Sequence, residues 1–449
     1  MPLLTRSRDR EHPGVRSRFW LWAGAVVLLA FLIREYFVLA AIVEIPIRGD
    51  IREYVLYAWN LVHHGVFSMT APQDIAPSPD AYRSPGFPWL LALCMWLRPE
   101  GDGWYSLALQ MQVLLGTATV WFTLLLARRW LRQGWALLAG VMIAVWPHHI
   151  AATGALLSEV AFGCALIAGL YCFAKALELE RIGWLALAAL VFGAAYLVNP
   201  LIALFPPLLA WLLWRAQGRR SSLLFLAIFL IPVLGLGLRN ASIDSLQNPH
   251  RMGRVAMNFV QGSWPQYHEA WKAQSLPTIH GISDEMALLD KNPCAGLSRV
   301  ATRMAAAPGD YAAWYLWRKP MLLWDWEIRI GNGGPYVLDV RHSPLDTNAL
   351  LRACSIILET LNPLLTLLAL GGIAWLLMYG WRRGPQMPAA AIATAYLALY
   401  LTLIHTALQA EPRYANAYRA IEVLLVATFL QLLVDRIAGR MHRSQPPAA

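Results

Sequence analysis

The stretch RGDIREY, residues 48–54, follows the first long apolar segment, at the point where the chain should leave a membrane. Charged residues crowd there, and an acid beside a bilayer surface, followed by aromatic residues, fits a site of chemistry. Helix capping fits as well, because Asp50 precedes an amphipathic stretch at 51–64 and Glu53 would complete a capping box. The spacing alone leaves Asp50 open to both interpretations.

The composition indicates a membrane protein. Of the 449 residues, 58% are hydrophobic and 14% are charged, whereas a soluble domain carries about 25% charged residues. Lipid must therefore be the solvent for much of the apolar surface. The net charge of +10 lies mainly in short arginine clusters between apolar segments, which indicates membrane topology and no nucleic-acid partner.

Apolar segments long enough to cross a bilayer, about 20 residues each, recur along the chain. We expect an all-α polytopic protein with about 10–11 transmembrane helices. The amphipathic stretch 51–64 predicts a helix that lies on the membrane surface, and the short apolar run 85–97 predicts a partial or re-entrant helix. The expected spans are 19–43, 105–127, 135–147, 160–175, 182–198, 201–214, 223–238, 362–381, 389–405 and 420–434.

The positive-inside rule assigns the sides of these spans. It places both termini in the cytoplasm, where a basic N-terminus followed by an uncleaved apolar run forms a signal anchor. The arginine clusters assigned to the cytoplasm are Arg6 to Arg18, 128–132, 215–220, 382–383 and 436–443. We expect three parts: an N-terminal membrane module at 1–238 with a first external loop at 44–84, an external segment at 239–351, and C-terminal membrane helices with a tail at 352–449.

The five cysteines contain no CxxC motif, so the sequence predicts no zinc or redox site. Cys294 and Cys354 both fall on the oxidising face in this topology, which permits a disulfide between them. Without geometry, two separate thiols fit equally well.

Glu159 lies at the start of an apolar helix, on the same external face as Asp50. It is a second candidate acid, although an acid in the first turn also complements a helix dipole. His148 and His149 lie shortly before it. Adjacent positions on a helix point apart and no HxxxH spacing exists, so we predict no metal site, and His149 stays a candidate for substrate contact.

Two arginines are candidates for binding an anion on the external face. Tyr82 and Arg83 lie just before the partial helix, where an arginine can also serve as an interfacial anchor. Arg413 and Tyr414 lie between the last two spans, and an arginine entering a bilayer indicates function or a buried partner. Such an arginine is suited to hold a lipid phosphate. Arg419 and Glu422, three residues apart in the final helix, can simply pair.

The order of these motifs resembles the GT-C glycosyltransferases, which include dolichyl-phosphate-mannose protein mannosyltransferases and bacterial aminoarabinose transferases of lipid A. The matching pieces are Asp50 with Tyr54, YRSPGFP at 82–88 against the family's R-P-P-G-Y-P, LLSE at 156–159, YLVNP at 196–200, and the late Arg413-Tyr414. The resemblance covers about residues 33–200 well and the last helices loosely. Ser84 replaces a proline of the motif, Asn199 stands where a basic residue is common, and Arg413-Tyr414 lacks the following proline.

The resemblance implies transfer of a sugar from a polyprenyl-phosphate donor to a glycolipid, glycan or protein acceptor. It implies a bacterial inner membrane, with the active face periplasmic. Asp50 would remove the acceptor proton, Arg413 and Arg83 would stabilise the departing phosphate, and Glu159 would orient the acceptor or a metal. The candidate substrate contacts are Tyr54, Tyr82, Arg83, His149, Asn199, Arg413 and Tyr414. No cofactor is certain, and a divalent metal is possible but not indicated.

Two other classes stay open. One is a transporter or flippase for a lipid-linked saccharide, but transporters tend to show internal repeats and interrupted helices near the midplane. No repeat is visible, and the polar residues gather at one face. A membrane scaffold without catalysis is compatible with everything in the sequence.

Overall fold

The computed structural model describes residues 13–71, 76–243, 253–331, 333–383 and 388–443. Arg6, Arg8 and Arg10 of the N-terminal cluster lie outside the described residues. The described chain is almost entirely helical, and its two short strands, β1 (Ile42–Val43) and β2 (Val340–His342), pair antiparallel. They join the end of the first span to the external segment.

Within the described ranges, six helices are long and apolar enough to cross a membrane, and a pair bent by 53° adds a seventh span. The six are α1 (Pro13–Ala40), α4 (Gly103–Ala127), α7 (Ser158–Leu179), α10 (Arg219–Ala241), α18 (Ala349–Arg383) and α19 (Ala389–Ala407). The bent pair is α5 (Gln133–Ala144) and α6 (Pro147–Ala151), which continues into η1 (Ala152–Gly154).

Three further helices account for the difference from the larger predicted count. They are α8 (Ile182–Val198), α9 (Phe205–Gln217) and α21 (Arg419–Arg443). With 17 and 13 residues, α8 and α9 are shorter than a usual span, and α21 carries charged residues in its first turn and second half. All three pack against the long spans and belong to the same bundle.

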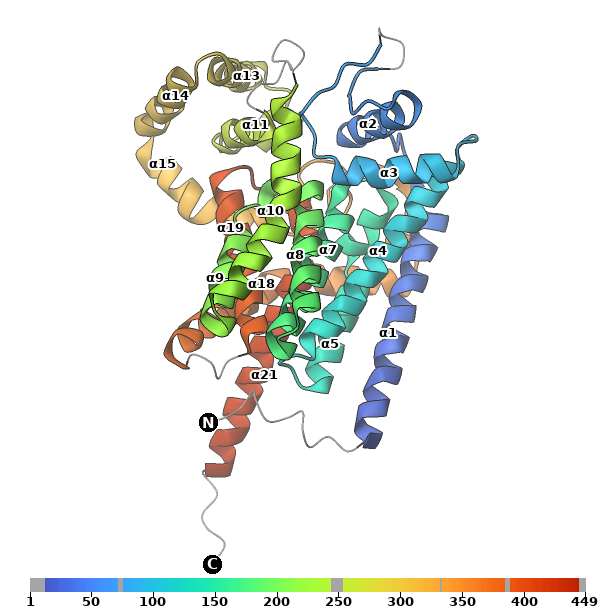
Figure 1. The fold of residues 1–449 in the computed structure, drawn as a ribbon, viewed down its shortest axis with the longest axis vertical. Helices are drawn as coiled ribbons and strands as arrows, with labels where there is room; N and C mark the ends of the chain where they lie inside the picture. Colours follow the sequence, from blue (N-terminus) through green and yellow to red (C-terminus); the bar gives the residue numbers. More distant parts are fainter. Residues whose placement is uncertain (1–12, 72–75, 244–252, 332, 384–387, 444–449) are drawn as a thin grey trace, which may run out of the picture.

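The remaining helices lie mainly at one end of the bundle, away from the start of α1 and the end of α21 (Figure 1). There α2 and α3 lie across the spans, and α11, α13, α14 and α15 form an arc beside them. Their bounds are α2 (Asp50–His64), α3 (Gly86–Leu97), α11 (Gly253–Gly262), α12 (Tyr267–Lys272), α13 (Leu276–Lys291), α14 (Pro293–Ala306), α15 (Pro308–Ala313), α16 (Lys319–Leu323), α17 (Pro344–Thr347) and α20 (Pro412–Ala415), with short turns η2 (Pro200–Ile202) and η3 (Trp314–Arg318).

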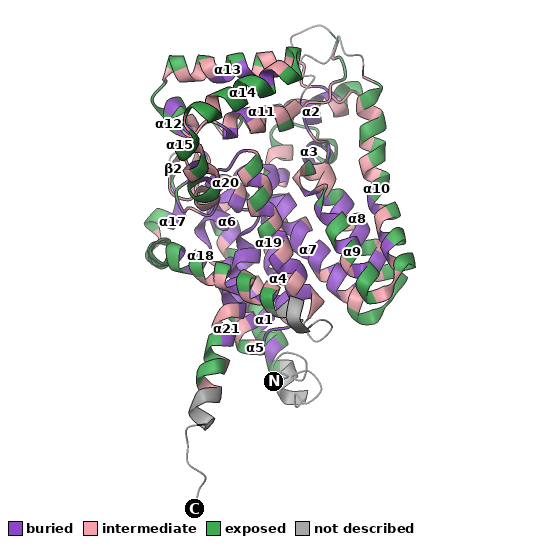
Figure 2. Ribbon diagram, turned by 90° about the vertical axis from the view of Figure 1, so that its left-hand side faces the viewer, coloured by how far each residue is buried: buried purple, intermediate pink, exposed green. Residues whose placement is uncertain are grey.

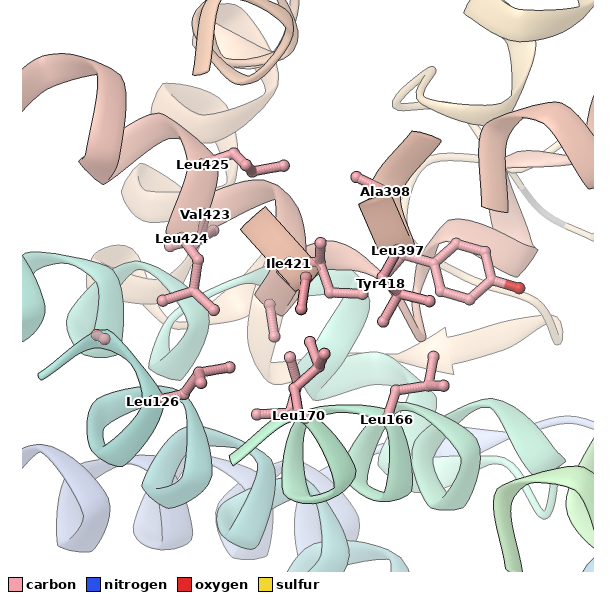
Figure 3. Packing of buried hydrophobic residues seen from close by; sticks show 14 of the residues in the cluster. Leu126, Leu166, Leu170, Leu397, Ala398, Tyr418, Ile421, Val423, Leu424 and Leu425 are labelled. Atoms are coloured by element: carbon pink, nitrogen blue, oxygen red, sulfur yellow. The ribbon is translucent and has the colours of Figure 1, made fainter. Parts of the chain in front are cut away.

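The core lies between two layers of spans. Figure 3 shows leucines of α4 and α7 facing α19 and α21, and the buried contacts include Leu126, Leu166, Leu170, Leu397 and Ile421. The central helix α7 is mainly buried, whereas α10 at the edge is mainly exposed or half-buried (Figure 2). Because α10 is nevertheless strongly apolar, we infer that its outer face contacts lipid.

The bent span is held by an arginine from α1. Proline at 147 interrupts the helix and leaves backbone carbonyls at the end of α5 without helical partners. Arg34 is fully buried and donates to the carbonyl oxygens of Ile143 and Ala144, both at 3.1 Å. Its Nη2 also lies 2.9 Å from His149 Nδ1. Arg34 and His149 therefore stabilise the break in this span.

The cysteines of the external face do not pair. Cys294 is an exposed free thiol in α14, and Cys354 is a half-buried free thiol in α18. A disulfide between them is therefore wrong for this structure, and the alternative of two separate thiols holds.

The close approach of α11 to the segment after α19 gives a stability prediction. A Cβ added at Gly262 would lie 1.8 Å from the Leu408 carbonyl oxygen and 2.8 Å from Gln409 Cα. Because both are backbone atoms, the segments must separate, and we expect Gly262→Ala to cost about 1–3 kcal/mol. Thermal unfolding of purified protein measures this. Gly309→Ala is the control, since nothing lies within 4 Å of its added Cβ, and equal losses in both variants would contradict the prediction.

Candidate functional site

Asp50 forms hydrogen-bonded ion pairs with Arg83 and Arg413 and does not cap its helix. It begins α2, but no side chain caps this helix end. Instead Asp50 Oδ1 lies 2.6 Å from Arg83 Nη2, and Asp50 Oδ2 lies 2.8 Å from Arg413 Nη2. The capping interpretation of Asp50 is therefore wrong, and both carboxylate oxygens accept charged hydrogen bonds.

Arg413 joins the second candidate acid to the first. The Nε of Arg413 lies 3.0 Å from Oε1 of Glu159. Glu159 belongs to the first turn of α7. No side chain caps α7 either, although the position of Glu159 still complements the helix dipole. One guanidinium thus bridges Asp50 and Glu159, which the sequence had placed on the same face.

Two further charged residues complete the cluster, and the sequence analysis missed both as site residues. Glu53, one turn after Asp50 on α2, pairs with Arg83. Arg254 of α11 has its Nη1 3.8 Å from Asp50 and 3.9 Å from Glu53. The helical spacing of Asp50 and Glu53 was a usable signal for Glu53. No local pattern marks Arg254, because it reaches the site only through the packing of the external helices.

Arg83 is buried, so the interpretation as an interfacial anchor is wrong. Its Nη1 lies 3.4 Å from the Tyr54 hydroxyl, and its guanidinium stands 4.8 Å from the centre of that ring. The loop before it is fixed by Asp80, which accepts hydrogen bonds from the backbone N–H groups of Met69 and Tyr82.

Gly86 allows the start of α3 to lie close to the end of α8. A Cβ there would lie 2.7 Å from the backbone of Leu197 and Val198, so only glycine lets the start of α3 approach the end of α8 this closely. The next residue along, Asn199, lines the same cavity as Arg83, while its side chain accepts a hydrogen bond from the Leu201 N–H.

The ion pairs favour the charged forms of Asp50 and Arg83. Burial raises the pKa of Asp50, but the charges of Arg413 and Arg83 outweigh burial and hold that pKa well below its usual range. Burial lowers the pKa of Arg83, but its interactions with Tyr54 and Asp50 outweigh burial and hold that pKa above its usual value. Asp50 is thus a weak base while both arginines hold it.

Two cavities meet at this cluster. The membrane-side cavity, about 450 Å³, extends from Arg83, Asp50 and Glu159 to apolar and aromatic residues of the spans. The external cavity, about 350 Å³, lies between α2, α11 and the segment 330–338. The residues that line both cavities are Asp50, Tyr82, Arg254, Asn258, Gln409, Arg413 and Tyr414.

The cavities differ in their relation to the membrane. The membrane-side cavity is lined by residues of three candidate spans, including Phe162 of α7, Leu236 of α10 and Ile404 of α19. None of the residues that line the external cavity belongs to a candidate span of the described chain. The membrane-side cavity therefore extends among the candidate spans, and the external cavity lies outside them.

The other candidate residues divide between this site and the spans. Tyr54, Tyr82, Asn199 and Tyr414 line the cavities. His149 lies elsewhere, against Arg34 in the bent span. Arg419 and Glu422 form a fully buried pair at 2.7 Å, as their spacing allowed, and Arg419 also donates to the Asp325 carbonyl. Across the described ranges, no group of three or more His, Cys, Asp or Glu side chains is arranged to hold a metal ion.

Arg413 is positioned through Glu411, which caps α20. The Glu411 carboxylate accepts hydrogen bonds from the N–H groups of Arg413, at 2.6 Å, and of Arg329, at 2.9 Å. It thereby ties the turn of Arg413 to the segment beside the external cavity. Burial raises the pKa of Glu411 to about 7, although the Arg413 charge opposes this.

This raised pKa predicts a pH-dependent stability. Between the ordinary pKa of about 4.3 and about 7, folded Glu411 binds more proton than unfolded Glu411, so stability falls as pH rises through this window. Above this pH window, burial of the ionised Glu411 carboxylate lowers the stability by its full amount. We expect the unfolding midpoint to drop from pH 5 to pH 8 by more in the wild type than in Glu411→Gln. Parallel pH profiles of the two proteins would contradict the assignment.

The comparisons with known proteins agree with this architecture. Residues 82–237 match the family model described as dolichyl-phosphate-mannose-protein mannosyltransferase. The fold is similar to the oligosaccharyltransferase of Archaeoglobus fulgidus in the apo form, with 15% identity and a TM-score of 0.50, over 94% of this chain and 51% of that chain. ArnT from Cupriavidus metallidurans bound to undecaprenyl phosphate also matches, with 16% identity and a TM-score of 0.37, over 96% and 81% of the two chains. No curated protein matches the sequence.

The chain spans about half the length of the archaeal oligosaccharyltransferase, and at this identity the likeness concerns the fold. The family model covers the region that contains the YRSPGFP, LLSE and YLVNP motifs. The predicted all-α membrane fold and the predicted resemblance are confirmed. The chain is a multi-span membrane protein with this fold, and its residues 82–237 are similar to the mannosyltransferase family.

Proposed function

We propose that the protein transfers a sugar from a polyprenyl-phosphate donor to a glycolipid, glycan or protein acceptor, with Asp50 as the base. The reaction would occur on the periplasmic face of a bacterial inner membrane. One observation carries the proposal: the carboxylate of Asp50 and the guanidinium of Arg413 lie on the shared wall of two cavities. One of these cavities reaches among membrane spans and the other does not.

The membrane-side cavity suits the donor. Its apolar part, including Phe162, Leu204 and Ile404, fits a prenyl chain, and its polar end presents Arg83 and Arg413. Arginine binds phosphate through paired, charge-assisted hydrogen bonds. The name of the matching family model, dolichyl-phosphate-mannose-protein mannosyltransferase, supports a donor of this class.

The ion pairs suggest the order of events. Both oxygens of Asp50 accept from arginines, so the carboxylate is not free to accept a proton from an acceptor. A donor phosphate competes for the same guanidiniums. When their charge is taken up by phosphate, the pKa of Asp50 rises toward its ordinary value, and Asp50 becomes a better base.

In the chemical step, each proton and charge is taken up by a group of the site or of the substrates. The acceptor hydroxyl or amine gives its proton to Asp50 and forms a bond to the sugar carbon. The bond between that carbon and the phosphate oxygen breaks, and its electron pair stays on the phosphate. Arg413 and Arg83 stabilise the new negative charge. Glu159, 3.0 Å from Arg413, keeps that guanidinium directed at the boundary of the cavities.

The first test is Asp50→Asn. The substitution keeps the shape of the side chain but removes the proton acceptor, so we expect sugar transfer to fall ~100-fold or more. The measurement is transfer of labelled sugar by purified protein in lipid, with thermal unfolding as the folding check. Near-normal turnover by a folded Asp50→Asn protein would exclude Asp50 as the base and leave Glu159 as the next acid to test.

The second test addresses the phosphate. Arg413→Lys keeps the charge but loses the forked geometry, and we expect undecaprenyl phosphate to bind ~10-fold more weakly or worse, since a hydrogen bond to a charged group contributes about 1.5–3 kcal/mol. Arg299→Lys, on the exposed surface of α14, is the control. Equal affinities in both variants would rule out Arg413 as a phosphate ligand.

A further inference from the structure

We infer that the external cavity recognises a neutral saccharide, which makes the acceptor a glycan hydroxyl rather than a peptide side chain. That this saccharide is the acceptor rests on the proposed function, whereas its chemical class is inferred from the residues that line the cavity. Three side-chain amides and three phenols line it, namely Asn258, Gln261, Gln409, Tyr82, Tyr267 and Tyr414.

These groups suit sugar hydroxyls. An amide side chain both donates and accepts hydrogen bonds, as a hydroxyl does, and a phenol adds a flat apolar ring. Asn258 Oδ1 has no hydrogen-bond partner among the described residues, so a polar group on a ligand would satisfy it. At about 350 Å³, the cavity lies near the small end of ligand sites, which are roughly 300–1,000 Å³.

The charges of the cavity are already compensated. Arg48 pairs with Asp339, and Arg254 faces Asp50 and Glu53. Arg413 is held by Asp50 and Glu159. Every arginine of this lining therefore has a carboxylate partner, and an uncharged ligand fits better than a strongly acidic or basic one.

The backbone around the cavity offers little to an extended peptide. Peptides are commonly bound by adding a strand to a free sheet edge. Here α2 and α11 form much of the wall, and helices satisfy most of their backbone groups internally. The nearby sheet of β1 and β2 is two to three residues long, so it offers an added strand very few backbone partners. Because no candidate span of the described chain contributes to the lining, the ligand arrives from the aqueous side.

The test is direct binding, which needs no donor and no turnover. Saturation-transfer NMR on the wild-type protein in lipid discs would compare neutral methyl glycosides with a blocked threonine peptide. We expect saturable signals from glycosides and none from the peptide. Saturable binding of the peptide instead, or no glycoside binding, would overturn the inference. Failure of sugar transfer alone would count against the proposed function and leave this result intact.

Two variants locate the binding. Gln261 lines the external cavity and not the membrane-side cavity, so Gln261→Ala should weaken glycoside binding tenfold or more while undecaprenyl phosphate binding stays unchanged. Gln266→Ala makes the same truncation at an exposed position outside both linings and should bind glycosides as the wild type does. Equal glycoside affinity in the two variants would place the sugar elsewhere and overturn the inference.

Discussion

The guanidinium of Arg413, shared between two carboxylates, holds the site together. It brings Asp50 at the start of α2 and Glu159 at the start of α7 to one point, although Asp50 and Arg413 are 363 positions apart in the sequence. Charges in such a setting are costly unless they are paired. Three arginines and three acids of the cluster, Arg83, Arg254 and Arg413 with Asp50, Glu53 and Glu159, compensate one another. The charges of this cluster therefore stabilise one another.

Apart from Glu159 at the start of α7, the residues that carry these charges lie outside the long spans. Arg83 follows a loop fixed by Asp80, and Arg413 lies in a four-residue helix capped by Glu411. The spans provide a rigid bundle, and the connecting segments bring chemistry to its end. This division agrees with the general location of functional residues on loops held by a stable scaffold.

The sequence predicted the class of fold and much of the site, because both depend on local signals. Apolar length marks a span, and a charge where a neutral residue would be expected marked Asp50, Glu159 and Arg413. Prediction from the sequence failed where the role of a residue depends on packing against distant parts of the chain. Nothing local distinguishes His149, which supports a bent span, from a substrate ligand. Arg254 reaches the cluster only because α11 packs across the end of the bundle, and the competition between capping and ion pairing at Asp50 is decided by partners far along the chain.

The bent span has a consequence for how the protein is made. Arg34 in the first helix donates a hydrogen bond to the carbonyl of Ala144, which is synthesised 110 residues later. Synthesis at roughly 5–20 residues per second leaves an interval on the order of ten seconds in which α1 is complete and its arginine has no partner from α5. An arginine in a membrane helix costs up to about 2.5–3.5 kcal/mol on insertion scales, the value for the helix centre, and Arg34 lies in the second half of α1. We expect the nascent first helix to wait near the headgroups, with Arg34 extended toward water, and to settle to its final depth when α5 arrives.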